Sequence, residues 1–378
     1  MNKKKFAKAC CCIIAGAIIA GTLSACQGKK DQVSPDPEYT AKLGEYQIWE
    51  NTPETAIPQY QIYNLVHSYL DECQISDSNA VSKENKTRKV LFLGFDGMRA
   101  DAAARLLTNT NEFNGSKSTT LNSSAIRTVS DEGGIYLAYC GGEKGTDTEQ
   151  TTSTSASWTS EFTGVWGSSH GVKTNDDVKN MNYKTFMLEY AEKGLNTAVA
   201  FDWDQYFDVN IKEEVKYVME NGNIPMVFCD TDREKKDKLK DTYAESLELY
   251  NFVAPETPSP SAPYDSGIRD WVIAQIESGT DVVCGIFHNV DTAGHTYEFS
   301  TGNSHYMNSA YSCDRSAYDI LQIVKEREKM YNEEWLVIFA NDHGGINQGH
   351  GEQSDEERMT WIATNRKFSE DILSKQSF

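Results

Sequence analysis

The sequence is short of positive charge, and this shortage limits what the protein can bind. Among 378 residues, 36 Lys and Arg stand against 56 Asp and Glu, for a formal net charge of -20. Because nucleic acid polymers are bound largely through their phosphates by Lys and Arg, a chain this acidic argues against such a partner. It leaves room for a small anionic substrate that metal ions hold in a local pocket.

Cysteine is scarce after residue 26, where five remain at irregular spacing: Cys73, Cys140, Cys229, Cys284 and Cys313. An odd number without a C-x-x-C pair indicates neither a disulfide framework nor a structural zinc finger. An exported protein can still form a disulfide, but the spacing alone does not pair these cysteines. The sequence also lacks the internal repeats that would indicate a solenoid.

Long apolar runs are missing except near the N-terminus. There a basic segment precedes an apolar run over residues 9–20, which is shorter than the roughly 20 residues of a membrane-spanning helix. The following Leu23-Ser-Ala-Cys26 resembles a bacterial lipobox, which implies cleavage before Cys26 and lipidation of its sulfur. The alternatives are an uncleaved anchor and an ordinary signal peptide. We therefore expect residues 1–25 to be a lipoprotein signal peptide. Cys26 would then hold the mature protein on the extracytoplasmic side of a bacterial cell membrane.

The rest of the chain predicts one main domain behind a tether. Residues 26–86 are expected to form the lipid-anchored segment, polar to about Pro58 and with a capping helix near residues 62–71. Residues 87–378 alternate apolar runs with helical patterns, among them a charged amphipathic helix near residues 232–250. This alternation predicts an α/β domain, with a doubly wound, mostly parallel sheet and helices on both faces.

Three short apolar runs are typical of strands buried on both faces: residues 90–95, 281–287 and 335–340. Carboxylate and imidazole side chains follow each run: Asp96 after the first, Asp291 and His295 after the second, and Asp342, His343 and His350 after the third. Each residue alone could belong to an ordinary turn. Because the carboxyl ends of parallel strands meet at one edge of a sheet, we expect all six together. Such ligands without thiolate suit Zn²⁺, Mn²⁺ or Fe.

The same ligands stand in four short motifs: Phe95-Asp-Gly-Met-Arg99, Asn289-Val-Asp-Thr-Ala-Gly-His295, Asn341-Asp-His-Gly-Gly345 and Gly349-His-Gly351. Together the motifs resemble the set that marks the alkaline phosphatase superfamily, and most of all its type I phosphodiesterase/nucleotide pyrophosphatase family. Thr163-Gly164 and Ser169-His-Gly171 resemble the element that follows the nucleophile of that family. The resemblance covers about residues 89–352 and implies an alkaline phosphatase-like fold.

The resemblance implies a site with two divalent metal ions, Zn²⁺ first among the candidates. One ion would be held by Asp291, His295 and His350, and the other by Asp96, Asp342, His343 and the nucleophile oxygen. The same alignment puts the nucleophile at Thr154 and a phosphate-binding amide at Asn175. The family's Phe and Asn after the nucleophile are Ser155 and Ser157 here, so several neighbouring hydroxyls compete: Thr151, Thr152, Ser153 and Ser155. We interpret His170 as structural, and His288 and His305 as surface or packing histidines.

The implied activity is hydrolysis of a small phosphate ester or pyrophosphate through a phosphothreonine intermediate. The alternatives are a phosphomonoesterase of the same superfamily and a non-catalytic surface solute-binding lipoprotein. A sulfatase would need a Cys/Ser-x-Pro-x-Arg stretch, which the sequence lacks near Thr154. A monoesterase would need cations around its doubly charged substrate, and Arg99, the nearest in sequence, is expected off the site. The sequence therefore favours diesters, and it does not identify the leaving group.

Overall fold

The computed structural model describes residues 36–76, 78–108, 124–177, 181–201, 203, 225–230 and 265–373. The expected signal peptide, Cys26 and the expected helix near residues 232–250 lie outside the described residues. Within the described ranges, no helix combines the length and the apolar character that crossing a membrane requires.

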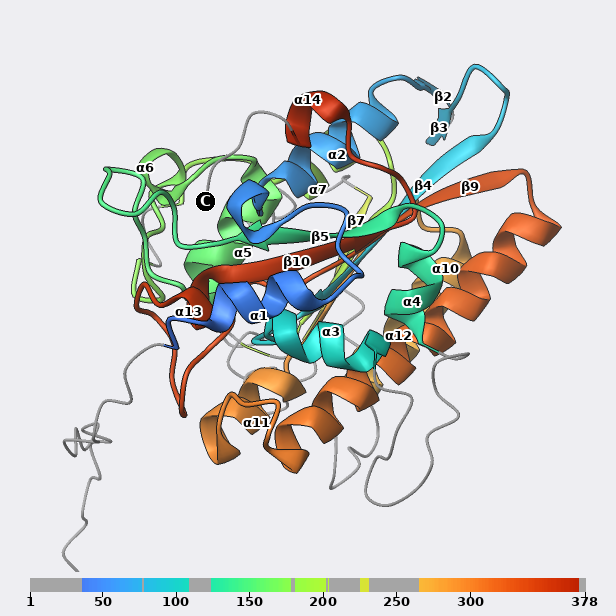
Figure 1. The fold of residues 1–378 in the computed structure, drawn as a ribbon. Helices are drawn as coiled ribbons and strands as arrows, with labels where there is room; N and C mark the ends of the chain where they lie inside the picture. Colours follow the sequence, from blue (N-terminus) through green and yellow to red (C-terminus); the bar gives the residue numbers. More distant parts are fainter. Residues whose placement is uncertain are drawn as a thin grey trace, which may run out of the picture. The chain divides into compact units, whose positions relative to one another are not determined.

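A mixed sheet of ten strands organises the described residues (Figure 1). The strands are β1 (Ile57–Pro58), β2 (Gln74–Ser76), β3 (Asn79–Val81), β4 (Thr87–Phe95), β5 (Gly134–Tyr139), β6 (Thr197–Phe201), β7 (Met226–Asp230), β8 (Val282–Phe287), β9 (Glu333–Ala340) and β10 (Met359–Thr364). Their order is β1-β5-β10-β9-β4-β8-β6-β7, with β3 pairing to β4 and β2 to β3. The run β9-β4-β8-β6-β7 is parallel throughout, whereas β10 is antiparallel to both of its neighbours.

Helices connect and cover the strands. They are α1 (Tyr39–Glu45), the 3-10 helix η1 (Pro53–Thr55), α2 (Gln61–Leu70), α3 (Ala100–Thr108), α4 (Ala125–Ser130), α5 (Thr154–Thr163), α6 (Gly167–His170), α7 (Phe186–Glu192), α10 (Asp265–Ser278), α11 (Asn289–Tyr297), α12 (Ser304–Met330), α13 (Asp355–Arg358) and α14 (Glu370–Leu373). Most long elements agree with the sequence prediction, including the helix near residues 62–71, which is α2.

The central strands are apolar on both sides because helices lie on both faces of the sheet. Side chains alternate along a strand, so Val90 and Phe92 of β4 pack with α2, α5 and α7. Leu91 and Leu93 pack on the opposite face with α3, α4, α10 and α12. Figure 1 shows the same two helical layers on either side of the sheet. The predicted α/β fold with a doubly wound, mostly parallel sheet is confirmed.

Two features differ from the prediction. The tether does not reach Pro58, because residues 39–58 form α1, η1 and β1, and β1 extends the sheet by pairing with β5. Tyr39 and Leu43 of α1 are buried in the core, which a free tether would not allow. The second difference is β10, which the sequence interpretation did not identify and which lies between β5 and β9.

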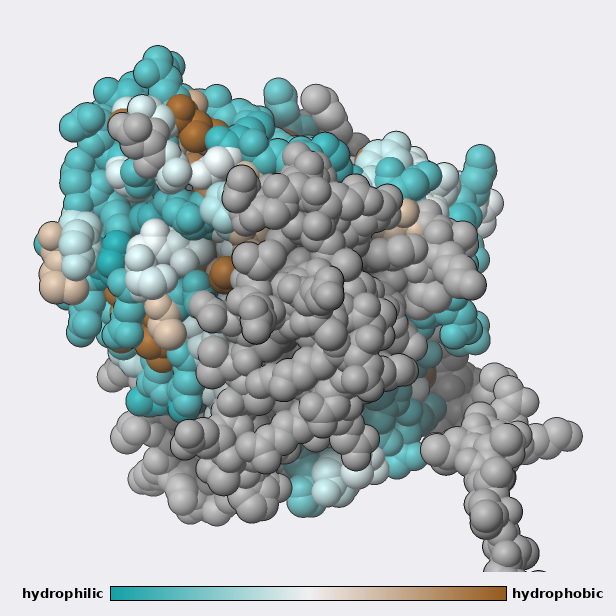
Figure 2. All heavy atoms as spheres, turned by 180° about the vertical axis from the view of Figure 1, so that it is seen from behind, coloured by the Kyte–Doolittle hydropathy of each residue, from teal (hydrophilic) through white to brown (hydrophobic). Residues whose placement is uncertain are grey.

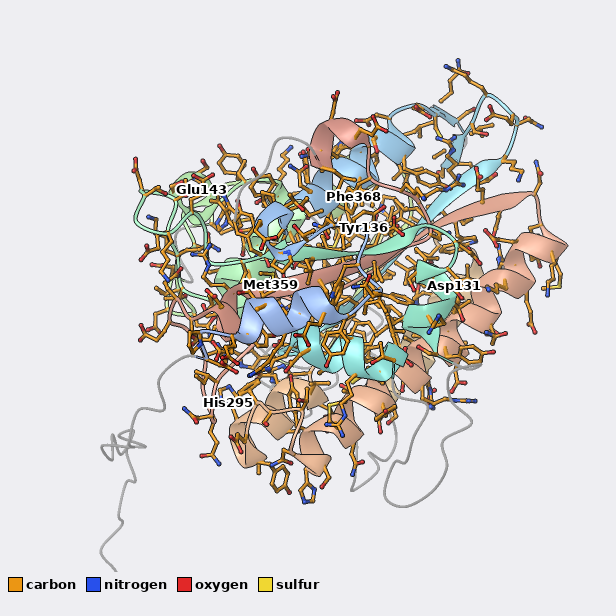
Figure 3. The ribbon with its side chains drawn as sticks, viewed as in Figure 1. Asp131, Tyr136, Glu143, His295, Met359 and Phe368 are labelled. Atoms are coloured by element: carbon orange, nitrogen blue, oxygen red, sulfur yellow. The ribbon has the colours of Figure 1, made fainter. Side chains whose placement is uncertain are left out.

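The outside of the described residues is mainly hydrophilic. Figure 2 shows teal atoms over much of the described surface on one face, with only small, separate hydrophobic spots. Inside, aromatic rings fill the layers next to the sheet. Tyr136 of β5, for example, meets Phe368 edge to face with ring centroids 5.0 Å apart (Figure 3).

Candidate metal and active site

Strand register brings two of the predicted carboxylates together. Parallel strands β4 and β9 are adjacent, and Gly94 is paired with Ala340 at their ends. Asp96 and Asp342 therefore leave the sheet side by side at its carboxyl edge. The backbone N–H of Gly97 donates to Asp342 Oδ1 at 3.0 Å, which joins the two strand ends.

The first ligand group consists of Asp291, His295 and His350. Asp291 and His295 are four residues apart in α11, so they share one face of that helix; Figure 3 labels His295 beside α11. His295 Nε2 lies 3.4 Å from Asp291 Oδ2 and 3.1 Å from His350 Nε2. His350 Nε2 lies 3.6 Å from Asp291 Oδ1. The fold thus brings together three predicted ligands that come from two distant parts of the chain.

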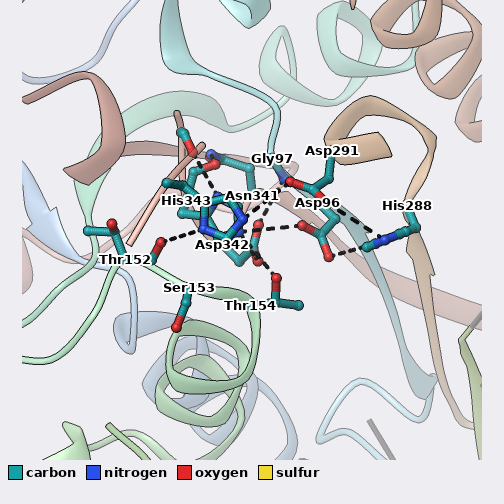
Figure 4. Close-up of polar contacts among 12 residues, drawn as sticks. Asp96, Gly97, Thr152, Ser153, Thr154, His288, Asp291, Asn341, Asp342 and His343 are labelled. Carbon is teal, nitrogen blue, oxygen red and sulfur yellow. Dashed lines mark hydrogen bonds and ion pairs between the residues drawn. The ribbon is translucent and has the colours of Figure 1, made fainter. Parts of the chain in front are cut away.

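The second ligand group consists of Asp96, Thr154, Asp342 and His343 (Figure 4). His343 Nε2 lies 3.2 Å from Thr154 Oγ1, 3.3 Å from Asp342 Oδ2 and 3.6 Å from Asp96 Oδ1. The two groups adjoin, because the rings of His343 and His350 stack with centroids 3.7 Å apart. The predicted ligands therefore form one continuous site.

Both groups have the dimensions of a metal site. Bonds of about 2.0–2.1 Å from Zn²⁺ to nitrogen or oxygen place the ligand atoms of a tetrahedron roughly 3.3–3.4 Å apart. The three separations in the first group, with Oδ2 of Asp291 facing His295 and Oδ1 facing His350, and the three that join His343 Nε2 to its neighbours in the second run from 3.1 to 3.6 Å and so bracket this value. Asp291 Oδ1 and Asp342 Oδ2 are also buried without a hydrogen-bond partner among the described residues. Such oxygens are costly to bury unless a cation or a proton neutralises them, so the donor set fits divalent cations.

The ring orientation of all three ligand histidines suits metal binding. Nδ1 lies 3.0 Å from Gln348 O in His295, 2.8 Å from Gly344 O in His343 and 2.9 Å from Thr152 O in His350. A carbonyl oxygen can only accept, so Nδ1 carries the proton in each ring. Nε2 therefore presents its lone pair to the ligand group, which is the arrangement expected of ligating histidines.

Electrostatics point the same way. Burial, together with the nearby charge of Asp96, raises the pKa of Asp291 and raises that of Asp342 well above its usual range. Burial lowers the pKa of His350 well below its usual range, and His343 and His295 lower it further. His350 is thus neutral, and the buried carboxylates of Asp291 and Asp342 lack a positively charged partner among the described residues. A divalent cation bound between them would supply that charge, which water cannot do.

The hydroxyl of Thr154 lies in the second ligand group. Thr154 is the first residue of α5, and the sequence left Thr151, Thr152, Ser153 and Ser155 as competitors. Thr151 and Thr152 donate their hydroxyls to backbone carbonyls at 2.9 and 2.8 Å, and Ser153 Oγ lies 2.5 Å from Thr151 Oγ1. The hydroxyl of Thr154 contacts a ligand of the group at hydrogen-bond length, with Oγ1 at 3.2 Å from His343 Nε2.

Asn175 lies beside the start of α5. Its Oδ1 accepts from the backbone N–H of Ser155 at 2.9 Å, and so satisfies one of the free N–H groups of the first helical turn. This position is next to Thr154, as the resemblance requires. The expected contact between the Asn175 amide and a phosphoryl oxygen stays a prediction.

Two further residues of the motifs, Gly164 and His170, have contacts that indicate a structural role. Gly164 ends α5 with φ +74°, and a Cβ there would lie 2.6 Å from the ring of Tyr63. His170 is buried and accepts at Nδ1 from the N–H of Val172, which leaves Nε2 to donate to Ser160 Oγ at 3.0 Å. Burial lowers the pKa of His170 to about 3. Its contacts agree with the structural role that the sequence interpretation expected.

The sequence interpretation placed neither Arg99 nor His288 in the site, and the contacts of these two side chains differ in the structure. Arg99 is buried, and its guanidinium donates to Asp101 and to the carbonyls of Phe299 and Gly345, so it lies off the site as expected. His288 is not the ordinary surface or packing residue that we expected. Its Nδ1 lies 3.1 Å from Asp96 Oδ2. The only sequence signal was its place directly after a buried strand.

No family model matches the sequence, and no curated protein matches it significantly. Solved structures are similar in part. Phosphonoacetate hydrolase from Sinorhizobium meliloti 1021 is 16% identical with a TM-score of 0.44, over 71% of this chain and 60% of that chain. A mutant of TAB5 alkaline phosphatase is 15% identical with a TM-score of 0.45, over 73% and 90%. The lipoteichoic acid synthase LtaP from Listeria monocytogenes is 12% identical with a TM-score of 0.42, over 82% and 72%.

The chain thus spans 60% of the length of the phosphonoacetate hydrolase. Similarity at this level identifies no activity, so the functional argument depends on the residues of the site.

Proposed function

We propose that the chain is a metal-dependent phosphodiesterase of the nucleotide pyrophosphatase type, which hydrolyses small phosphate esters or pyrophosphates through a phosphothreonine. The observation that carries the proposal is the position of Thr154. Its Oγ1 lies 3.2 Å from His343 Nε2, inside a group of metal-type ligands and at the N-terminus of α5. A threonine hydroxyl is a poor nucleophile until a cation stabilises its alkoxide, and this position provides for one.

Two divalent ions would occupy the two ligand groups. Asp291, His295 and His350 would hold one, and Asp96, Asp342, His343 and Thr154 Oγ1 the other. We propose Zn²⁺, because nitrogen and oxygen donors without thiolate suit it, with Mn²⁺ and Fe as alternatives. When bound, the ions would supply positive charge for the phosphoryl oxygens, the Thr154 alkoxide and the leaving group.

The residues of the chain would then carry the reaction in two displacements. In the first, Thr154 Oγ bonds to phosphorus and gives its proton to solvent, while the bond from phosphorus to the leaving oxygen breaks and that oxygen takes a proton from solvent. In the second, the oxygen of water bonds to phosphorus and a proton of that water passes to solvent, while the bond to Thr154 Oγ breaks and Thr154 Oγ regains a proton from solvent. We propose that the amide N–H of Asn175 and the positive end of α5 would orient the phosphoryl oxygens; the support is that Asn175 Oδ1 accepts from the N–H of Ser155, which holds the Asn175 amide beside Thr154.

We propose a diester as the preferred substrate. Arg99, the cation nearest to the ligand motifs in the sequence, is buried and donates to Asp101 and to the carbonyls of Phe299 and Gly345. A phosphomonoester carries a second negative charge that needs cationic partners, whereas a diester carries one. This supports the diesterase over the monoesterase.

The test compares bis(p-nitrophenyl) phosphate with p-nitrophenyl phosphate, for the metal-free protein and after addition of Zn²⁺. We expect turnover only with metal and a preference for the diester. Thr154→Val should lower kcat by at least about 10³-fold while two ions still bind, and Ser153→Ala is the matched control that keeps its activity. A phosphoryl group trapped by acid quench should map to the peptide with Thr154. Preference for the monoester would favour the phosphatase alternative, and a fully active Thr154→Val would exclude the proposed nucleophile.

We also propose that Cys26 is lipidated and holds the protein on the extracytoplasmic side of a bacterial membrane. The support is the lipobox-like segment before Cys26. Labelled fatty acid should enter the wild-type protein and not the Cys26→Ala variant, and labelling of both would contradict the assignment.

A further inference from the structure

His288 has contacts at its backbone and along one face of its ring. It follows β8 directly, and its backbone N–H donates to Oδ1 of the buried Asp265 at 2.9 Å. Its ring lies nearly parallel to the indole of Trp203, with centroids 6.2 Å apart and an angle of 12° between the planes. The backbone bond sets where the half-buried ring begins, and the indole lies along one of its faces.

The ring of His288 faces carboxylates of both ligand groups. Nδ1 lies 3.1 Å from Asp96 Oδ2, and Nε2 lies 3.8 Å from Asp291 Oδ2 (Figure 4). The three ligand histidines differ, because their Nδ1 atoms face backbone carbonyls and their Nε2 atoms face the ligand groups. His288 instead directs Nδ1 itself to a carboxylate of the site.

The two oxygens of Asp96 face different partners. Oδ1 is directed to the second ligand group, 3.6 Å from His343 Nε2, and Oδ2 is directed to His288. Asp96 is fully buried. If the Asp96 carboxylate rotates about its Cβ–Cγ bond, Oδ1 faces the second ligand group in only part of its orientations. A hydrogen bond to the other oxygen therefore favours the binding orientation.

We propose that His288 is a positioning residue of the metal site. Its Nδ1–H donates to Asp96 Oδ2 and holds Oδ1 toward the ion of the second ligand group, and Trp203 supports the ring. The proposal rests on the proposed two-metal function. It assigns His288 no contact with substrate, and it concerns the second ion more than the first because Nε2 is beyond hydrogen-bond distance of Asp291.

Conservative substitutions distinguish positioning from direct metal ligation. The amide nitrogen of asparagine is bonded to Cγ, as Nδ1 of histidine is, so it can donate from nearly the same position. His288→Asn should therefore retain the hydrogen bond to Asp96. His288→Leu removes the donor while keeping apolar bulk against Trp203. If His288 were itself a ligand, both variants would lose the ion, since an amide nitrogen does not ligate Zn²⁺ as imidazole does.

The experiment measures Zn²⁺ stoichiometry and affinity of the full chain by competition with a chromophoric chelator. The control is His305→Leu, because His305 is exposed and its ring stacks on Tyr297, which is not among the proposed ligands. We expect two ions for wild type and His305→Leu. His288→Leu should bind one of its two ions about 10- to 100-fold more weakly, and His288→Asn should stay within a few-fold of wild type.

The outcomes separate this inference from the proposed function. If wild type binds no Zn²⁺, the two-metal function fails. If wild type binds two ions and His288→Leu binds both equally well, the positioning role is wrong. The positioning role is also wrong if His288→Asn loses as much affinity as His288→Leu. Thermal unfolding of each variant in chelator reports folding, so a fold defect is recognised separately.

Discussion

Replacing Gly97 with alanine should damage the first ligand group, although Gly97 ligates nothing. Gly97 has φ +68°, and an added Cβ would lie 2.9 Å from each of three atoms of Asp291, namely Cα, Cβ and Oδ1. The Cα atom belongs to the backbone of α11, so turning the Asp291 side chain does not relieve the overlap. The helix itself has to move.

The expected loss of unfolding free energy in Gly97→Ala has two components. Alanine in the left-handed region costs about 1–2 kcal/mol. Overpacking against fixed backbone adds about 1–3 kcal/mol. Carbon atoms in contact settle about 3.5–4.0 Å apart, so Asp291 has to retreat by about 0.5–1 Å, whereas metal–ligand distances tolerate about 0.2 Å. We therefore expect Gly97→Ala to lose about 2–5 kcal/mol of unfolding free energy and at least about tenfold in Zn²⁺ affinity.

Gly145→Ala is the matched control. Gly145 has φ +77°, and nothing lies within 4 Å of its added Cβ, so this variant carries the backbone term alone. Urea unfolding in chelator gives the free energies, and competition with a chromophoric chelator gives the Zn²⁺ affinity. If Gly97→Ala matches Gly145→Ala in both measurements, the close approach of Gly97 to Asp291 does not control the site and the reasoning is refuted.

Three further predictions concern stability. Burial raises the pKa of Asp314 to about 6, although hydrogen bonds from the first turn of α4 lower it. The folded protein therefore binds the proton of the Asp314 carboxyl more tightly than the unfolded chain does. Its stability should fall as pH rises from about 4 to 6. Asp314→Asn should be more stable than wild type at pH 8 by up to about 3 kcal/mol in urea unfolding, with a gap that closes toward pH 4; a constant gap would contradict this. Lys89→Met should cost about 3–5 kcal/mol, because Lys89 Nζ bonds to Asp281 Oδ1 at 2.6 Å in a buried pair, and Lys89→Met with Asp281→Asn should recover part of the loss. Zn²⁺ at about 100 times its dissociation constant should stabilise the metal-free protein by about 2.7 kcal/mol, and an unchanged thermal midpoint would argue against a metal bound by the folded state.

Local pattern in the sequence was enough to predict the strands and the residues that end them. Residues 90–95 form a nearly unbroken apolar run, with Gly94 inside it, and residues 335–340 form an unbroken one, which favours burial of both strands on both faces. Asp96 follows the first run directly and Asp342 follows the second after one residue, Asn341, so their place at the sheet edge needed only the assumption of parallel pairing. Asp291 and His295 are four residues apart, and α11 turns that spacing into a shared helical face.

Other parts of the site needed the tertiary structure. The resemblance had put the nucleophile at Thr154 with four neighbouring hydroxyls as competitors, and the tertiary structure shows the Thr154 hydroxyl 3.2 Å from His343 Nε2, in the turn after β9. Strand β10 was missed because its antiparallel place between β5 and β9 depends on pairing with segments far away in the chain. The order of strands in a sheet is set by such non-local contacts.

The sequence alone thus determined which side chains leave the buried strands, since the alternation of apolar residues is a property of neighbours along the chain. The tertiary structure decided which of those side chains meet. The role of His288 is the clearest case, because its contact with Asp96 joins residues 192 positions apart and depends on the register of β4 against β8. No local pattern encodes the direction in which that ring points. Packing of the whole domain sets it.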